Sequence, residues 1–442
     1  MNSALLRILF NPAPFLRVVP PLLVAAALSA CGGGRSTPAP GPAQLAVAVP
    51  AVPVPDLAPL TRLQALGQKI FNDHNLSEPR GMACVTCHAP QTGFAGNNGS
   101  VIGVAFGSRP GVLGLRNAMT NAYAGFIPAF SWRVDADDGD TDPVGGHFWD
   151  ARADTLALQA TMPFLAAAEM NNPSAAALVG KVALADYAGL MKAEFGNGVF
   201  ADPAQALLDM GSAIAAFETS GQLQQFSSKY DSFIKGVVPL SPAENRGMLL
   251  FMDPKRANCA SCHLMNPASA NPQDSLFSDF SLYANGIPRN SAIPENANPG
   301  FFDLGLCGPA RTRPALGANV PASVSIERFC GTFKMPMLRN VAAREAFMHN
   351  GFFKNLKEVV EFYATRNSNP TRWYGPAGVP NDLPVAYLPN IQKDHAPFNS
   401  PPEAGPVLTP AEIDDVVAFL KTLTDGYKRP ASSTTPAPAP TP

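Results

Sequence analysis

The chain has 442 residues, a formal net charge of −2 and only 15% charged residues. This length allows two or more domains, and the near-neutral charge gives no electrostatic basis for binding nucleic acid. Most of the chemical information lies in seven cysteines and six histidines.

The first 31 residues predict a lipoprotein signal peptide. Two arginines precede an apolar run over residues 20–30, which is too short to span a membrane. The run ends in Leu-Ser-Ala-Cys, which resembles a bacterial lipobox with Cys31 as the lipidated residue. The alternative is a plain secretory signal with an incidental cysteine. Both predict export, and the lipobox predicts a periplasmic protein anchored to a bacterial membrane, with the outer membrane favoured.

The middle of the chain predicts helices joined by long loops. Residues 32–56 are rich in Pro and Ala and predict a linker, and residues 429–442 predict a disordered tail. Between them, the apolar spacing predicts helices over 57–71, 155–168 and 203–217. Ser241 and Thr409 each open a capping box with Pro in the next position, which predicts two further helices. No convincing run of alternating strand residues appears.

Two pentapeptides, at residues 84–88 and 259–263, share the pattern C-x-x-C-H. In this pattern two cysteines form thioethers to a c-type haem, and the histidine becomes the proximal iron ligand. The predicted haem-binding residues are Cys84, Cys87 and His88 for one haem, and Cys259, Cys262 and His263 for the other. A thiol redox pair needs no following His, and a zinc site needs further paired ligands.

Each pentapeptide follows a predicted helix and a loop. A unit of helix, loop and C-x-x-C-H therefore occurs twice in the chain. The predicted fold is all-α, with two cytochrome c-like domains over residues 57–232 and 233–428, each carrying one covalently attached haem. The stretches 89–148 and 264–335 are rich in Gly, Pro and Asn and predict long ordered loops. Cys307 and Cys330 remain unassigned in one such loop, and an exported chain favours a disulfide between them.

Further segments resemble the bacterial di-haem cytochrome c peroxidase and MauG superfamily. They are residues 69–71 with 76–77, 148–153 (FWDARA), 169–170, 333–340 (FKMPMLRN), 348–351 (MHNG) and 417–424. The resemblance covers residues 57–427 in unbroken order.

For the first haem, the resemblance implies an open iron site. Many family peroxidases have a distal His after the haem motif, but no His lies between His88 and His147 here. Arg109 falls near its place and becomes a candidate catalytic residue. The alternative is that Met119 or Tyr123 ligates this iron.

The same resemblance assigns three residues around the first haem. Glu169 matches the catalytic carboxylate, which would move a proton between the two peroxide oxygens. Trp149 matches the tryptophan between the two haems, where it would relay an electron or simply pack. Arg152 would pair with a haem propionate.

For the second haem, the resemblance implies a distal ligand at Tyr363, with Met335 or Met337 as the alternative. It also implies a calcium ion between the haems, held by Asn117 and by backbone oxygens of Arg344 and Ala346.

The function that the resemblance implies is enzymatic. The chain would be a di-haem c-type peroxidase that reduces hydrogen peroxide at the N-terminal haem with electrons passed through the C-terminal haem. A high-valent intermediate, as in MauG, is a variant of this mechanism. The electron donor would be a cytochrome c, a cupredoxin or a quinone-linked donor. The alternatives are a MauG-like oxidase of a protein or organic substrate, and a di-haem cytochrome that only transfers electrons.

Overall fold

Helices dominate the protein, for which we used a computed structural model that describes residues 58–134, 141–308 and 324–429. Its α-helices are α1 (Arg62–Phe71), α2 (Cys84–Cys87), α3 (Leu156–Leu165), α4 (Ala175–Val182), α5 (Ala188–Phe195), α6 (Pro203–Glu218), α7 (Lys229–Ile234), α8 (Pro242–Met252), α9 (Leu356–Thr365), α10 (Pro370–Tyr374) and α11 (Pro410–Lys421). Short 3₁₀ turns connect many of them.

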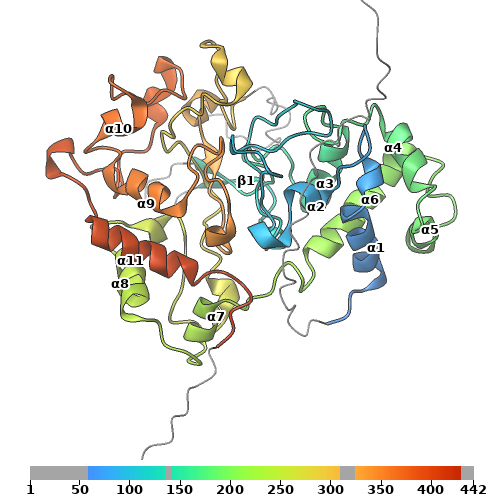
Figure 1. Cartoon of the computed structure of the whole chain (residues 1–442), viewed down its shortest axis with the longest axis horizontal. Helices are drawn as coiled ribbons and strands as arrows, with labels where there is room; N and C mark the ends of the chain where they lie inside the picture. Colours follow the sequence, from blue (N-terminus) through green and yellow to red (C-terminus); the bar gives the residue numbers. More distant parts are fainter. Residues whose placement is uncertain (1–57, 135–140, 309–323, 430–442) are drawn as a thin grey trace, which may run out of the picture. The chain divides into compact units, whose positions relative to one another are not determined.

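The first half of the chain builds a core from α1, α3 and α6 (Figure 1). α1 begins at a capping box in which Thr61 and Gln64 bond reciprocally. Gly67 lets α1 approach α6 closely, because a Cβ at this position would lie only 1.8 Å from the carbonyl oxygen of Ala213. The helix that precedes the first C-x-x-C-H motif is therefore fixed against the last helix of its half.

The second half repeats this arrangement with α8 and α11, which pack against each other (Figure 1). Both predicted capping boxes are present, at Ser241 and at Thr409. Gly247 lets α8 approach α11 closely, as Gly67 does for α1 and α6. A Cβ at Gly247 would lie 1.9 Å from the carbonyl oxygen of Asp415. The repeat predicted from the sequence, helix followed by loop and C-x-x-C-H, is present in both halves.

The all-α prediction is corrected by two small antiparallel sheets. The first pairs β1 (Ser131–Val134) with β2 (Thr141–Val144), and the second pairs β3 (Leu282–Tyr283) with β4 (Phe333–Lys334). Strands of two to four residues are too short to display an alternating pattern. β3 and β4 also lie far apart in the sequence, so local spacing could not predict their pairing.

The described residues lie within one compact unit. The predicted boundary between residues 232 and 233 falls inside α7, and Tyr230 of α7 packs in the second core, so α7 belongs to the second half. The predicted signal peptide with Cys31, the linker and nearly all of the predicted tail lie outside the described residues. Within the described ranges, no helix has the length and apolar character needed to cross a bilayer.

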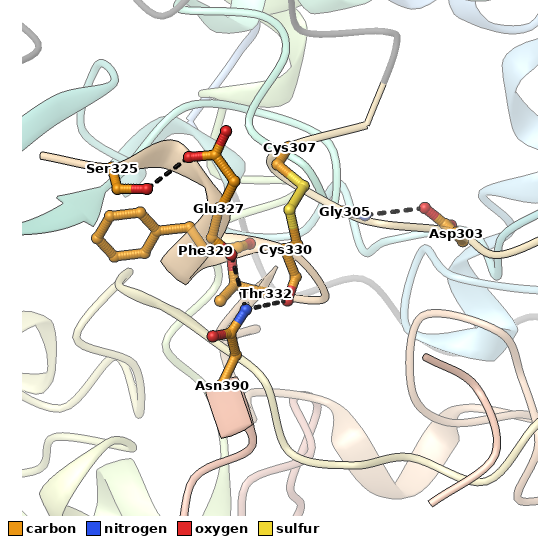
Figure 2. The surroundings of a disulfide bond; sticks show 9 residues. All are labelled: Asp303, Gly305, Cys307, Ser325, Glu327, Phe329, Cys330, Thr332 and Asn390. Atoms are coloured by element: carbon orange, nitrogen blue, oxygen red, sulfur yellow. Dashed lines mark hydrogen bonds between the residues drawn. A yellow bond between two sulfur atoms is a disulfide. The ribbon is translucent and has the colours of Figure 1, made fainter. Parts of the chain in front are cut away.

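Cys307 and Cys330 form a disulfide bond, with their Cα atoms 4.9 Å apart (Figure 2). The Asn390 amide donates a hydrogen bond of 3.1 Å to the Cys330 carbonyl. The amide of Gly305 donates to the Asp303 carboxylate, shown on the Cys307 side of the bond. The disulfide therefore fixes the loop that carries Asp303.

Candidate functional site

The first C-x-x-C-H motif lies at the wall of a cavity, with its cysteines on the short helix α2. The His88 Nδ1–H donates a 2.9 Å hydrogen bond to the carbonyl oxygen of Phe94. A bond of this kind fixes the ring and the tautomer of a metal-binding histidine and leaves Nε2 for the metal. Burial lowers the pKa of His88, which keeps the imidazole neutral as an iron ligand must be.

The second motif is built in the same way. Cys259 begins a 3₁₀ turn (Cys259–Ser261), and His263 lines a second cavity. Its Nδ1–H donates a 2.8 Å hydrogen bond to the carbonyl oxygen of Phe277. Burial again lowers the pKa of the histidine. Both motifs thus present a neutral, oriented imidazole to a cavity.

None of the four motif cysteines forms a disulfide, and burial raises the pKa of each. Burial raises the pKa of Cys87 and of Cys259 to about 12, and it also raises the pKa of Cys84 and Cys262. A redox-active cysteine needs a stabilised thiolate, and these surroundings do the opposite. Across the described residues, His, Cys, Asp and Glu side chains do not gather in threes that could hold a metal ion, so the arrangement also lacks a zinc site there.

Glu169 lines the same cavity as His88. It sits in the turn after α3, where its amide donates to the Ala166 carbonyl. Burial raises the pKa of the Glu169 carboxyl, and the charge of Arg152 partly opposes the shift. A raised pKa favours the protonated carboxyl, which suits a group that accepts a proton and passes it on. The structure thus brings three of the predicted site residues, His88, Glu169 and Arg152, to one cavity.

The loop around Gly107 and Ser108, where many family peroxidases have a distal His, is hydrogen bonded to the turn that contains Glu169. The Ser108 amide donates a 2.8 Å hydrogen bond to the Glu169 carbonyl, and a Cβ on Gly107 would lie 2.5 Å from the Ala168 carbonyl oxygen. Arg109 is exposed, donates to the Ala167 carbonyl, and is not among the residues that line the cavity. Its predicted catalytic role is therefore corrected, because its guanidinium is held at the outside of the turn.

The two alternative ligands of the first iron differ in position. Met119 lines the cavity of His88, so it stays an alternative ligand of this iron. The Tyr123 hydroxyl donates to both oxygens of the Asp425 carboxylate, at 2.9 and 2.8 Å, and Tyr123 is not part of the cavity wall.

Trp149 and Lys334 line both cavities and so connect them. The Trp149 Nε1–H donates a 2.8 Å hydrogen bond to the carbonyl oxygen of Asn117. The Lys334 amide donates to the Trp149 carbonyl, and its buried ammonium donates to the Gly146 carbonyl. Burial lowers the pKa of Lys334 to about 7. Trp149 therefore lies between the two motif cavities, and its role as an electron relay stays a prediction.

Arginines and aspartates of both halves meet at the wall of the first cavity. Arg116 forms a bidentate pair with Asp303, at 2.6 and 2.7 Å, and a third contact of 2.8 Å with Asp150. Arg116 holds the pKa of Asp303 down to about 2. Arg152 bonds to the other oxygen of Asp150 at 3.0 Å and stacks on Phe148. The loop fixed by the disulfide thus supplies one acid of this network.

The residues predicted to hold calcium lie close together. The Asn117 amide donates to the carbonyl oxygen of Ala346 at 2.9 Å, and its Oδ1 is buried without a hydrogen-bond partner. Arg344 also donates to the Ala346 carbonyl, and its other nitrogen donates to Ala118. The orphaned Oδ1 fits a cation, whereas the guanidinium of Arg344 occupies part of the same space.

Tyr363, on α9, lines the second cavity together with His263. Its hydroxyl accepts a 3.4 Å hydrogen bond from the Asn285 side chain. The competing residues Met335 and Met337 line this cavity as well. The cavity therefore contains both Tyr363 and the two methionines, and the choice of Tyr363 as the distal ligand stays a prediction.

Comparison with known proteins identifies the family. A family model described as di-haem cytochrome c peroxidase matches residues 61–238. The methylamine utilization protein MauG of Paracoccus denitrificans is 32% identical over 406 residues, which cover 88% of this chain and 95% of that protein. The chain belongs to the di-haem cytochrome c peroxidase family. It is therefore an oxidoreductase, and the family implies two c-type haems.

Other relatives agree with this assignment. The cytochrome c551 peroxidase of Pseudomonas aeruginosa is 26% identical over 393 residues, covering 85% of this chain and 84% of that protein. The crystal structure of the diheme peroxidase BthA from Burkholderia thailandensis has a TM-score of 0.76 and 40% identity, covering 84% of this chain and 87% of that chain. The family includes both peroxidases and MauG, and similarity alone does not choose between them.

The residues around both motifs fit a haem in each cavity. Each cavity joins two cysteines, an oriented imidazole and an apolar wall, which are the parts that a covalent haem needs.

In the first cavity, Oε2 of Glu218 is buried without a hydrogen-bond partner. Burial raises the pKa of this carboxyl to about 8.

Sequence reasoning missed several residues of these cavities. Gln159, on α3, lines the first cavity with Glu169, and Glu218 closes α6 at the same cavity. Lys334 lines both cavities. It belongs to segment 333–340, whose resemblance to the family assigns no role to this lysine. Residues 301–304, from the second half, line the first cavity. Helical spacing placed Gln159 and Glu218 on helices, but only the packing shows which cavity they reach.

Proposed function

We propose that this chain is a di-haem peroxidase that reduces hydrogen peroxide in the cavity of His88 and handles electrons in the cavity of His263. The haems, when bound, supply the redox chemistry. The observation that carries the proposal is the Glu169 carboxyl, which shares the first cavity with His88 and has a pKa raised by burial. A pure electron carrier has no need of such a group.

In this proposal Glu169 moves a proton. Its carboxylate would accept a proton from the inner peroxide oxygen. The protonated carboxyl, which burial stabilises, would then give this proton to the outer oxygen. Gln159 lines the same cavity and can hydrogen bond to peroxide or to the carboxyl, which would orient either group. The fixed backbone bond from Ser108 keeps the Glu169 turn in place.

Peroxide consumption by the holoprotein tests the proposal. The holoprotein should consume hydrogen peroxide while it oxidises a reduced small c-type cytochrome or a cupredoxin. An EPR spectrum of the ferric protein should contain one high-spin haem, because the proposal leaves the first iron an open site for peroxide. Two low-spin haems together with no peroxide consumption would instead indicate an electron-transfer cytochrome.

A MauG-like oxidase is the second candidate, and Tyr363 favours it. A tyrosinate ligand lowers the potential of an iron and so favours oxidised states over simple electron delivery. The similarity to MauG of Paracoccus denitrificans agrees with this candidate. In that case the chain would consume peroxide at the expense of an organic or protein substrate. Reduced cytochrome and cupredoxin would then fail as donors.

Trp149→Phe should slow electron transfer between the cavities. The change removes the indole that lines both cavities and leaves the Asn117 carbonyl without its donor. We expect a loss of stability of about 1–3 kcal/mol from the unpaired carbonyl. We also expect slower peroxide turnover with unchanged haem content, measured by stopped-flow reduction and a haem assay.

Trp373→Phe is the matched control for this variant. Trp373 is also buried, and its Nε1–H also donates a hydrogen bond, to the Thr365 hydroxyl. It does not line either cavity. If both variants slow turnover equally, Trp149 acts only through packing and the relay is excluded.

We also propose a calcium ion at Asn117, held with backbone oxygens of Arg344 and Ala346. The buried, unpartnered Oδ1 of Asn117 supports it, because calcium prefers oxygen ligands. The Arg344 guanidinium would have to turn away from Ala346. Treating the holoprotein with EGTA should then remove most of the peroxide turnover, and calcium but not magnesium should restore it. Turnover that is insensitive to EGTA, with no calcium found by elemental analysis, would contradict this site.

Finally, we propose that the protein works in the periplasm, anchored to a membrane through a lipid on Cys31. The lipobox-like sequence and the covalent haem chemistry of the family support this location.

A further inference from the structure

Arg366 is a buried cation at the end of α9, three residues after Tyr363. Its side chain makes three hydrogen bonds within the described residues, to the carbonyl oxygens of Asn285 and Gln392 and to the Asn367 side chain. All three acceptors are neutral. Burial accordingly lowers the pKa of Arg366 to about 10. A buried charge without an anionic partner is costly, so its retention calls for a reason.

One connection from Arg366 to Tyr363 runs through Asn285. An Nη1–H of Arg366 donates a 3.1 Å hydrogen bond to the Asn285 carbonyl. The Asn285 side chain in turn donates to the Tyr363 hydroxyl at 3.4 Å, and it lines the same cavity. The guanidinium therefore fixes the backbone from which this donor reaches the phenol.

A second connection runs through Phe398. The guanidinium lies 3.5 Å from the centre of the Phe398 ring. The Phe398 and Tyr363 rings are stacked, with centroids 5.4 Å apart and an angle of 26° between the planes. The guanidinium of Arg366 and the ring of Tyr363 thus both pack against the Phe398 ring. Cation–π contacts of this kind are stronger when they are buried.

We propose that Arg366 is a positioning residue that holds Tyr363 as the anionic ligand of the second haem. It fixes Asn285 and Phe398 around the phenol, and its charge offsets that of a tyrosinate. The proposal explains why a buried guanidinium has only neutral oxygens as acceptors. It rests on the proposed function, in which Tyr363 ligates this iron.

The test compares the ferric holoprotein with the variants Arg366→Gln, Arg366→Lys and Asn285→Ala. The readouts are the tyrosinate-to-iron charge-transfer absorption and the midpoint potential of the second haem. Arg366→Gln should remove most of the absorption and raise the potential towards that of Tyr363→Phe, because the anionic ligand is lost. Arg366→Lys keeps the positive charge but loses the planar guanidinium, so this variant should retain part of the charge-transfer absorption. Asn285→Ala removes the donor to the phenol and should lose part of the same absorption.

Arg372→Gln is the matched control. Arg372 also lies over an aromatic ring, that of Trp373, but its side chain is 46% exposed and pairs with Glu361. It should leave both readouts unchanged. If Tyr363→Phe removes the absorption while Arg366→Gln and Asn285→Ala behave like Arg372→Gln, the role of Arg366 is overturned and the ligand assignment stands. If Tyr363→Phe changes nothing, the ligand assignment fails and the inference fails with it.

Discussion

Glu169→Gln should slow peroxide consumption by about 10²–10⁴-fold, the range typical of losing a general acid–base group. Gln has nearly the same shape as Glu, so the cavity should keep its form. Its amide cannot accept and return the proton that cleavage of the peroxide bond requires. The backbone bond from Ser108 to residue 169 does not involve the side chain and should survive. Steady-state assays at saturating donor would measure the effect.

Asp186→Asn provides the control for this change. It converts another carboxylate to an amide, at a side chain that is 76% exposed and pairs with Lys69. Its turnover should equal that of the wild type. Haem content and the ferric spectrum should be unchanged in both variants. A Glu169→Gln enzyme with wild-type turnover would remove this residue from the mechanism and return the proton transfer to water.

Arg339→Met should destabilise the holoprotein by about 3–5 kcal/mol, because it leaves a buried carboxylate without its partner. Arg339 and Asp231 are both almost completely buried and form a bidentate pair, with nitrogen to oxygen distances of 3.0 and 3.1 Å. Arg339 also donates to the carbonyls of Pro272 and Ser275. It therefore joins α7, which carries Asp231, to the loop after the second haem motif. Chemical denaturation followed by circular dichroism would measure the loss.

Arg246→Met is the comparison for the buried pair. Arg246 forms a bidentate pair with Asp415 of similar geometry, but its side chain is 59% exposed. Water can solvate Asp415 after the change, so the midpoint of denaturation should barely move. Equal losses in the two variants would mean that geometry, and not burial, determines the energy of these pairs.

Local sequence patterns were sufficient for the parts that depend on near neighbours. The capping boxes at Ser241 and Thr409 predicted the starts of α8 and α11, since a cap bonds only three residues ahead. The C-x-x-C-H motifs similarly placed His88 and His263 beside their cysteines. By contrast, the strands β3 and β4 were missed because their two-residue pairing depends on the approach of distant segments.

The residues of the candidate site also differ in how far the sequence could predict their positions. The family resemblance predicted Glu169, Trp149 and Tyr363, and the cavities bring each of them to the motif expected. Arg109 was chosen because of its position in the sequence, but the loop around Gly107 turns its side chain outward to bond to Ala167. Sequence position alone does not determine the direction in which a loop side chain points.

The sequence by itself therefore determined the two haem motifs, and its resemblance to the family predicted a catalytic carboxyl and a distal tyrosine. Only the tertiary structure decided what surrounds these groups. It placed Lys334 beside Trp149, brought Asp303 to Arg116 across 187 residues of sequence, and buried Arg366 behind Tyr363. The physical reason is that a covalent motif needs only adjacent residues. Burial, charge balance and pKa depend on every segment that packs around a group, and these segments are distant in sequence.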